Sequence, residues 1–184
     1  KSFSVVGPFG DAIRSMRTLG IKGAGVTMPF KKKVRHYVDV VHESAQIGPA
    51  NTIVNKQGKL VAYNTDYMAA IDYLKRYKDH SYEKFIIMGS GGYGTAVQCA
   101  ALSIGMDFTV WAGKELLVFE KTHSHGIAEI ENTLFYNCTP IKGLRVSDSS
   151  ELIDCDVESK TGLELAGMQA SYQFKLYTGI DHTF

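Results

Sequence analysis

Apolar positions near the start of the chain recur at helical spacing and then form a short continuous run. Asp11 precedes AIRSMRTLG, in which three apolar side chains share one helical face: Ile13, Met16 and Leu19. We therefore expect a helix that Asp11 caps and that Gly20 ends in a left-handed conformation. The next segment, IKGAGVTM (21–28), is apolar and rich in small residues. It predicts a buried strand that another part of the molecule approaches closely.

Three further elements are expected before a polar break in the sequence. Segment 31–41 predicts a helix, because its apolar residues stand at helical spacing: Val34, Tyr37, Val38 and Val41. Two apolar runs on either side of the polar tip 56–59 predict a β-hairpin. A helix is expected to begin at Asp66 and to end near Tyr77. The polar segment 78–83, KDHSYE, is the expected domain boundary.

The second half of the chain alternates between strands and helices. KFIIMG predicts a strand, and a glycine-rich turn and a helix closed by Gly105 separate it from a second strand, FTVWA. This order predicts a βαβ unit with parallel strands, the start of a doubly wound sheet. LFYNCTP predicts another strand, and LELAGMQASYQFKLYTG predicts a long amphipathic helix. We therefore predict an α/β protein of two domains. An N-terminal α/β substrate domain, 1–78, is completed by a returning C-terminal helix, 160–184, and a Rossmann-like dinucleotide-binding domain spans 79–159.

Composition and charge argue against several classes of protein. With 45% hydrophobic and 21% charged residues over 184 positions, the chain resembles an ordinary globular protein. A formal net charge of +1 gives no electrostatic basis for binding nucleic acid or an acidic membrane. No apolar run reaches the roughly 20 residues that span a bilayer. The first residues are too polar for a signal peptide, so we expect a cytoplasmic protein.

The cysteines and histidines show no pattern typical of a disulfide framework or a metal centre. Cys99, Cys138 and Cys155 are widely spaced and are interpreted as reduced core residues. His123 and His125 could share one face of a strand, but no further pair stands nearby with ligand spacing. We expect no metal site.

The turn after KFIIM carries the pattern GxGxxG. In such a turn the first glycine permits a tight bend, the second lets the backbone approach a pyrophosphate, and the third lets the helix pack closely. An ordinary glycine-rich turn would show the same letters, but the strand before it and the small-residue helix after it favour dinucleotide binding. The candidate cofactor-binding residues of the turn are Gly89, Ser90, Gly91, Gly92 and Gly94.

The residues after the second strand bear on the choice of cofactor. An acidic residue at that point would bind the ribose 2′-hydroxyl of NAD, whereas a basic residue suits the 2′-phosphate of NADP. The sequence places Lys114 there and has no acid before Glu115. This favours NADP, with Lys114 as the phosphate contact, and leaves NAD as the alternative.

Four phrases in this order, GVTMPFK, IGPANTI, NTD and GSGGYG, resemble the shikimate dehydrogenase family. The corresponding phrases of the family run close to NVTxPFK, GAVNT, NTD and GxGG. RTLGIKGAGVTMPFK and AYNTDY resemble more closely the shikimate dehydrogenase-like branch, and ELAGMQASYQFKLYTG resembles the family's substrate-contacting helix. The resemblance covers most of the chain. It implies an oxidoreductase that reversibly transfers a hydride between NADP and the C3 hydroxyl of shikimate, in aromatic amino-acid biosynthesis.

Matched position by position, the resemblance places the family's catalytic lysine on Lys31 and its catalytic aspartate on Asp66. Its substrate-binding residues fall on Thr27, Asn51 and Gln169. The chemistry agrees, because a lysine beside a carboxylate can move a hydroxyl proton or stabilise an alkoxide. Neutral amides and hydroxyls suit a polyhydroxylated ring. Taken singly, Asp66 could instead cap its helix and Asn51 could stand in a turn.

The chain also departs from the family, and alternatives remain. KSFS aligns with the family's second strand, so Ser2 and Ser4 are not matched to the serines that bind the substrate carboxylate. Segment 111–162 is short for the remaining βα units of a cofactor domain, which fits either an abridged chain or a degenerate relative. An NAD-using quinate/shikimate dehydrogenase and a non-catalytic dinucleotide-binding regulator are the alternatives; Lys31 and Asp66 together argue against the regulator. We expect a monomer or homodimer that binds a small-molecule substrate in the cleft between its domains.

Overall fold

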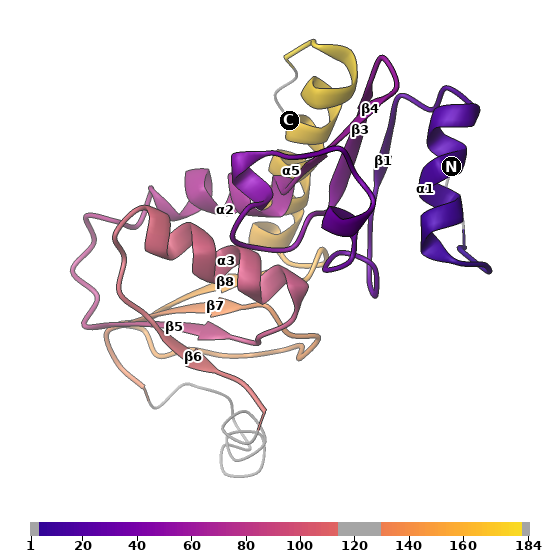
Figure 1. The fold of residues 1–184 in the computed structure, drawn as a ribbon. Helices are drawn as coiled ribbons and strands as arrows, with labels where there is room; N and C mark the ends of the chain where they lie inside the picture. The colour runs from indigo at the N-terminus through magenta and orange to yellow at the C-terminus, as the bar shows by residue number, and fades with distance from the viewer. Residues whose placement is uncertain (1–3, 114–129, 182–184) are drawn as a thin grey trace. The chain divides into compact units, whose positions relative to one another are not determined.

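The computed structural model describes residues 4–113 and 130–181, which fold into two units (Figure 1). The first unit comprises Lys1–Thr65 and Ala170–Phe184, and the second comprises Asp66–Gln169. The division falls inside two helices, α2 (Thr65–Leu74) and α5 (Lys160–Thr178). The polar segment 78–83, expected as a domain boundary, lies within the second unit, and the expected division of the domains stays a prediction.

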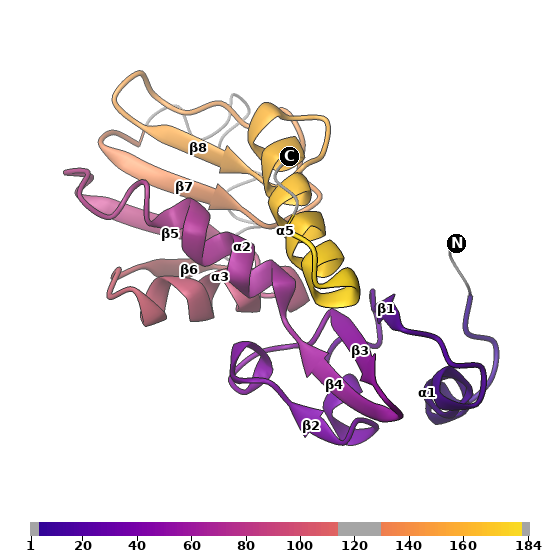
Figure 2. The ribbon, with the colours of Figure 1, turned by 90° about the horizontal axis from the view of Figure 1, so that it is seen from above.

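The first unit is built around a mixed sheet with the strand order β1-β3-β4-β2. The expected hairpin is confirmed, since β3 (Thr52–Lys56) and β4 (Lys59–Tyr63) are antiparallel. β1 (Gly23–Gly25) runs antiparallel to β3, and β2 (Val40–Val41) runs parallel to β4. Figure 2 shows these strands and helix α1 (Phe9–Thr18) from above. Helix and sheet share a core that includes Phe9, Ile13, Met16, Val34, Ile53 and Leu60.

Helix α1 begins earlier than its sequence indicated. Its first residue is Phe9 and its N-cap is Pro8, so the expectation that Asp11 caps the helix is wrong. Asp11 lies in the first turn, where a carboxylate still interacts favourably with the helix dipole. The expected end is confirmed by Gly20, which has a φ of 62°.

The segment expected as a helix over 31–41 forms only the 3₁₀ turn η1 (Val34–His36), followed by β2. The N–H of Asp39 donates to the Leu60 carbonyl (3.0 Å), and the Asp39 carboxylate accepts from the Leu60 N–H (2.6 Å). These two bonds tie the segment to the edge of the sheet. The valines of the segment suit a strand as well as a helix, so pairing with β4 outweighs the helical spacing.

The second unit contains a parallel sheet with the strand order β6-β5-β7-β8. The expected βαβ unit is confirmed as β5 (Lys84–Met88), α3 (Gly92–Ser103) and β6 (Thr109–Trp111). The strand expected within LFYNCTP is β7 (Thr133–Asn137), and β8 (Glu151–Asp154) was not expected. From β5 the chain passes to one side and then to the other, so the order reverses at β5. In such sheets ligands bind beyond the carboxyl ends of the strands at the reversal.

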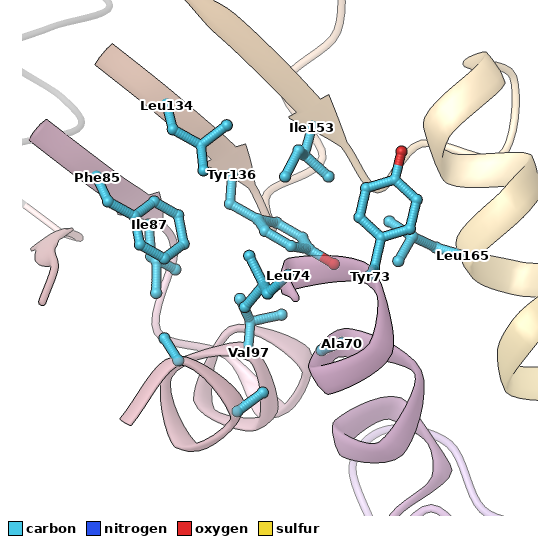
Figure 3. Packing of buried hydrophobic residues seen from close by; sticks show 12 residues of the cluster. Ala70, Tyr73, Leu74, Phe85, Ile87, Val97, Leu134, Tyr136, Ile153 and Leu165 are labelled. Carbon is cyan, nitrogen blue, oxygen red and sulfur yellow. The ribbon is translucent and has the colours of Figure 1, made fainter. Parts of the chain in front are cut away.

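The core of the second unit lies between one face of its sheet and the helices α2, α3 and α5 (Figure 3). Alternation along β5 explains this, because Phe85 and Ile87 face the helices whereas Ile86 and Met88 pack on the opposite face. Other members of the helix-side core are Tyr73, Leu74, Val97, Leu134, Tyr136, Ile153 and Leu165. The α/β class and the C-terminal helix are thus as expected. None of the helices in the described ranges is long and apolar enough to cross a membrane.

Candidate active site

Lys31 follows a tight turn in the first unit. The Phe30 N–H donates to the Thr27 carbonyl (3.0 Å), and the Lys31 carbonyl accepts from the Ala50 N–H (3.1 Å). Asn51 follows Ala50 directly, so the backbone brings three of the candidate residues into one region of this unit. Thr27 is exposed, whereas Lys31 is half-buried and Asn51 is buried.

The Asn51 side chain is fixed by its oxygen. Its Oδ1 accepts from the Thr65 N–H (2.8 Å), the Thr65 hydroxyl (3.1 Å) and the Thr52 hydroxyl (3.0 Å). The Thr65 N–H is an obligate donor, so the accepting atom is the oxygen of the amide. Asn51 therefore holds the first residue of α2 through its oxygen. Its amide nitrogen makes no hydrogen bond to the described residues and is the group that can bind a ligand. The possible turn role and the substrate role of Asn51 are compatible in this geometry.

A pocket of about 200 Å³ within the second unit brings together Asp66 and Gln169. Asp66 is the second residue of α2 and is 7% exposed, and Gln169 stands on α5. Tyr93, Cys155 and Leu165 are among the residues that complete the wall. A carboxylate and an amide in a largely apolar wall can bind the hydroxyl groups of a small ligand.

The thiols and phenols near this pocket are uncharged. Burial raises the pKa of Tyr93, of Tyr136 and of the Cys138 thiol well above their ordinary values. Burial, with the charges of Asp154 and Asp156, raises the pKa of Cys155 to about 11. Because the thiolate is the nucleophilic form of cysteine, neither thiol is suited to nucleophilic catalysis at neutral pH. The site chemistry is therefore carried by the carboxylate, amides, hydroxyls and lysine.

Tyr93 is a pocket residue that the sequence analysis did not single out. It stands between the last two glycines of the pattern GxGxxG, on the first turn of α3. The available signal was its size, because a large aromatic residue in a turn of glycines needs space nearby. Tyr93 lines the pocket, and its hydroxyl oxygen lies 2.9 Å from the Tyr136 hydroxyl oxygen.

The glycine turn has the shape that its pattern requires. Gly89 has a φ of 102°, and a Cβ there would touch the Thr139 side chain and the Cys138 carbonyl. A Cβ on Gly94 would overlap the Gly89 carbonyl, so strand and helix approach as closely as backbone allows. A Cβ on Gly91 would meet none of the described residues within 4 Å, so that part of the structure leaves the backbone open there. The turn thus offers a tight bend, an accessible backbone and, at the start of α3, N–H groups that have no partner within the helix.

Of the remaining candidate cofactor-binding residues, Ser90 and Gly92 lie within the described residues and Lys114 does not. Ser90 is exposed and Gly92 is the first residue of α3. Lys114, the candidate contact for the 2′-phosphate, lies outside the described residues, as do His123 and His125. Within the described ranges, no three His, Cys, Asp or Glu side chains gather as metal ligands.

Helix α5 packs on the glycine-rich strand β1 within the first unit. A Cβ on Gly23 would overlap the Tyr177 ring, and a Cβ on Gly25 would reach the Gln173 amide at 3.4 Å. The Gln173 amide nitrogen also donates to the Thr52 hydroxyl (2.9 Å). The close approach expected at 21–28 is therefore confirmed, and the approaching element is the end of the C-terminal helix.

Comparison with known proteins agrees with the motifs. Residues 3–53 match the family model of the shikimate dehydrogenase substrate binding domain. A shikimate dehydrogenase-like protein of Haemophilus influenzae is 44% identical over 97 residues, covering 52% of this chain and 36% of that protein. A shikimate dehydrogenase (NADP(+)) of Caldanaerobacter subterraneus is 41% identical over 108 residues, covering 58% of this chain and 39% of that protein.

A solved structure shows the same similarity in three dimensions. A shikimate 5-dehydrogenase-like protein aligns with a TM-score of 0.74 and 28% identity, over 95% of this chain and 78% of that one. The chain thus resembles the shikimate dehydrogenase family in sequence and in fold. The matched sequence spans less than half the length of the two curated relatives.

Proposed function

We propose that this chain is an NADP-dependent dehydrogenase that reversibly oxidises the C3 hydroxyl of shikimate to a ketone. The observation that carries the proposal is the pocket that joins Asp66 and Gln169, which are far apart in sequence. The resemblance to the family assigns catalysis to Asp66 and substrate binding to Gln169. The first unit supports it by gathering Thr27, Lys31 and Asn51 through backbone hydrogen bonds.

Each side chain then has a distinct task in the proposed reaction. Asp66 accepts a hydrogen bond from a substrate hydroxyl, and Gln169 offers both a donor and an acceptor. Asn51 offers its amide nitrogen, because its oxygen is engaged by Thr52 and Thr65. Lys31 takes the proton of the hydroxyl that is oxidised, and in the reverse direction returns it.

The glycine turn is the proposed site of the cofactor pyrophosphate. Gly89, Gly91 and Gly94 meet the three backbone requirements of a dinucleotide turn, and Gly91 leaves the approach open. Bound NADP supplies the acceptor for the hydride that leaves the substrate carbon. The preference for NADP over NAD rests on Lys114, and it stays a prediction, as do the monomeric or dimeric state and the cytoplasmic location.

The test is an assay of the purified protein with shikimate and with quinate, each with NADP and with NAD, followed by the absorbance of the reduced nicotinamide. We expect turnover with shikimate and NADP at the highest kcat/KM of the four pairs. Preference for quinate with NAD would favour the alternative dehydrogenase. Dinucleotide binding without turnover of any pair would instead identify a binding protein.

A further inference from the structure

Tyr93 and Tyr136 form a hydroxyl pair beside the pocket of the second unit. Tyr93 lines the pocket with Asp66 and Gln169, whereas Tyr136 on β7 lies behind it with no exposed surface. The two phenol oxygens are 2.9 Å apart, and either could be the donor. The direction of this hydrogen bond determines whether the Tyr93 hydroxyl can donate its proton to a ligand in the pocket.

Burial settles the direction of this hydrogen bond. Each phenol carries one proton, and within the described residues the Tyr93 oxygen is the only hydrogen-bond partner of the Tyr136 hydroxyl. If Tyr93 donated, the Tyr136 proton would be buried without an acceptor, which proteins avoid. Tyr136 therefore donates, Tyr93 accepts, and the proton of Tyr93 is left for an acceptor in the pocket that Tyr93 lines.

We propose that the Tyr93 hydroxyl donates a hydrogen bond to a neutral oxygen of the ring substrate, a hydroxyl or a carbonyl, and so helps to select that substrate. The inference rests on the proposed function, because it takes the pocket of Asp66 and Gln169 as the substrate pocket. A neutral oxygen is favoured over a carboxylate because the charge of Asp66 disfavours a second anion in the same pocket.

The protonation state of Tyr93 agrees with this role. Burial raises the pKa of Tyr93 well above its ordinary value, and the charge of the Asp66 carboxylate acts in the same direction. The phenol therefore keeps its proton throughout the neutral and alkaline range in which a dehydrogenase is assayed. Tyr93 and Asp66 thus form a complementary donor and acceptor on one pocket wall.

The test compares three variants with the wild type: Tyr93→Phe, Tyr136→Phe and the double variant. Tyr93→Phe keeps the ring and removes the donor, so we expect kcat/KM for shikimate to fall about 3- to 10-fold, mainly through KM, as for one hydrogen bond between neutral groups. Tyr136→Phe removes the same tyrosine–tyrosine bond but leaves the Tyr93 proton, so kcat/KM should change by less than about twofold. The double variant should match Tyr93→Phe in kcat/KM.

Thermal unfolding separates this role from simple packing. Tyr93→Phe leaves the buried Tyr136 hydroxyl without a partner, so its melting temperature should be the lowest, and the double variant should recover part of the loss. Titration with NADP should give the same affinity for all variants. Equal kcat/KM losses in the two single variants, or wild-type kcat/KM in Tyr93→Phe, would overturn the inference while the proposed function stands. A wild type that turns over none of the ring substrates would overturn both.

Discussion

Lys31 differs from the two lysines that follow it in its surroundings. It is half-buried, and its carbonyl is tied to Ala50, whereas Lys32 and Lys33 are exposed. A positioned proton-transfer group contributes about 10²- to 10⁴-fold in rate. We therefore expect Lys31→Met to lower kcat by that factor and to leave NADP affinity unchanged.

Lys32→Met and Lys33→Met are the matched controls for Lys31→Met, because they remove the same charge one and two residues away. Substitution of exposed lysines generally has little effect, so both should keep kcat near that of the wild type. Steady-state kinetics of the three variants checks this. A Lys31→Met enzyme as fast as the wild type would show that the lysine run is only a solvated turn.

Substitutions at two glycines of the turn should have different effects, one on cofactor binding and the other on stability. Gly91→Val places a side chain in open space where the pyrophosphate is proposed to lie, so NADP affinity should fall about tenfold or more in a folded protein. Gly94→Ala is the control with the opposite outcome, because its Cβ would overlap the Gly89 carbonyl. We expect it to lower the free energy of unfolding by about 1–3 kcal/mol. Titration calorimetry and urea unfolding measure the two effects, and unchanged NADP affinity in Gly91→Val would remove the turn from the cofactor site.

At the scale of elements, the packing of α5 on β1 depends on the absence of a side chain at Gly23. The Tyr177 ring occupies the space that a Cβ would need, and ring and strand backbone are both stiff. Gly23→Ala should therefore destabilise the protein by about 1–3 kcal/mol. The Tyr177→Leu substitution removes the ring. In that background, Gly23→Ala should lower the free energy of unfolding by less than it does when Tyr177 is present. Denaturant unfolding of the two single variants and the double variant gives this coupling, and strictly additive losses would count against the contact.

Elements with a local signal could be predicted from the sequence, and elements held by distant partners could not. The hairpin, α3, β5 and β7 each carry an apolar period and flanking glycines or polar residues. β8 has only four residues, ELID, with acids at both ends, and it exists through its pairing with β7. In segment 31–41 the sequence predicts a helix that does not form. The hydrogen bonds between Asp39 and Leu60 hold the segment against β4 instead.

The same distinction applies to the candidate site. Asp66 and Gln169 carry motif signals, and the structure places both on one pocket. Tyr93 carries only the signal of its size, because the role of its hydroxyl depends on Tyr136, which lies 43 residues away in sequence. The packing of α5 on β1 was likewise indicated only by β1, whose small residues leave room for another element. The sequence of α5 did not indicate which strand it contacts.

At the scale of the whole molecule, each unit contains an aspartate whose ionised form folding favours. The N–H of Leu60 and the guanidinium of Arg17 lower the pKa of Asp39 in the first unit. The N–H of Glu158 and the ammonium of Lys142 lower the pKa of Asp156 in the second. A lowered pKa in the folded state means that the stabilisation is complete above the ordinary value of 3.8 and is lost as pH falls through the lower, folded value.

Acid unfolding of the two units should therefore respond to separate substitutions. In Asp39→Asn, the stability of the first unit should be lower at neutral pH and should depend less on pH below about 4, and Asp156→Asn should do the same to the second unit. Asp107→Asn is the control, because Asp107 is exposed and is joined to none of the described residues by a side-chain hydrogen bond or ion pair. Amide hydrogen exchange at a series of pH values reads the sheet of each unit separately. If Asp39→Asn weakens protection equally in β3 and β7, the units unfold as one cooperative body, and the acid response belongs to the whole chain.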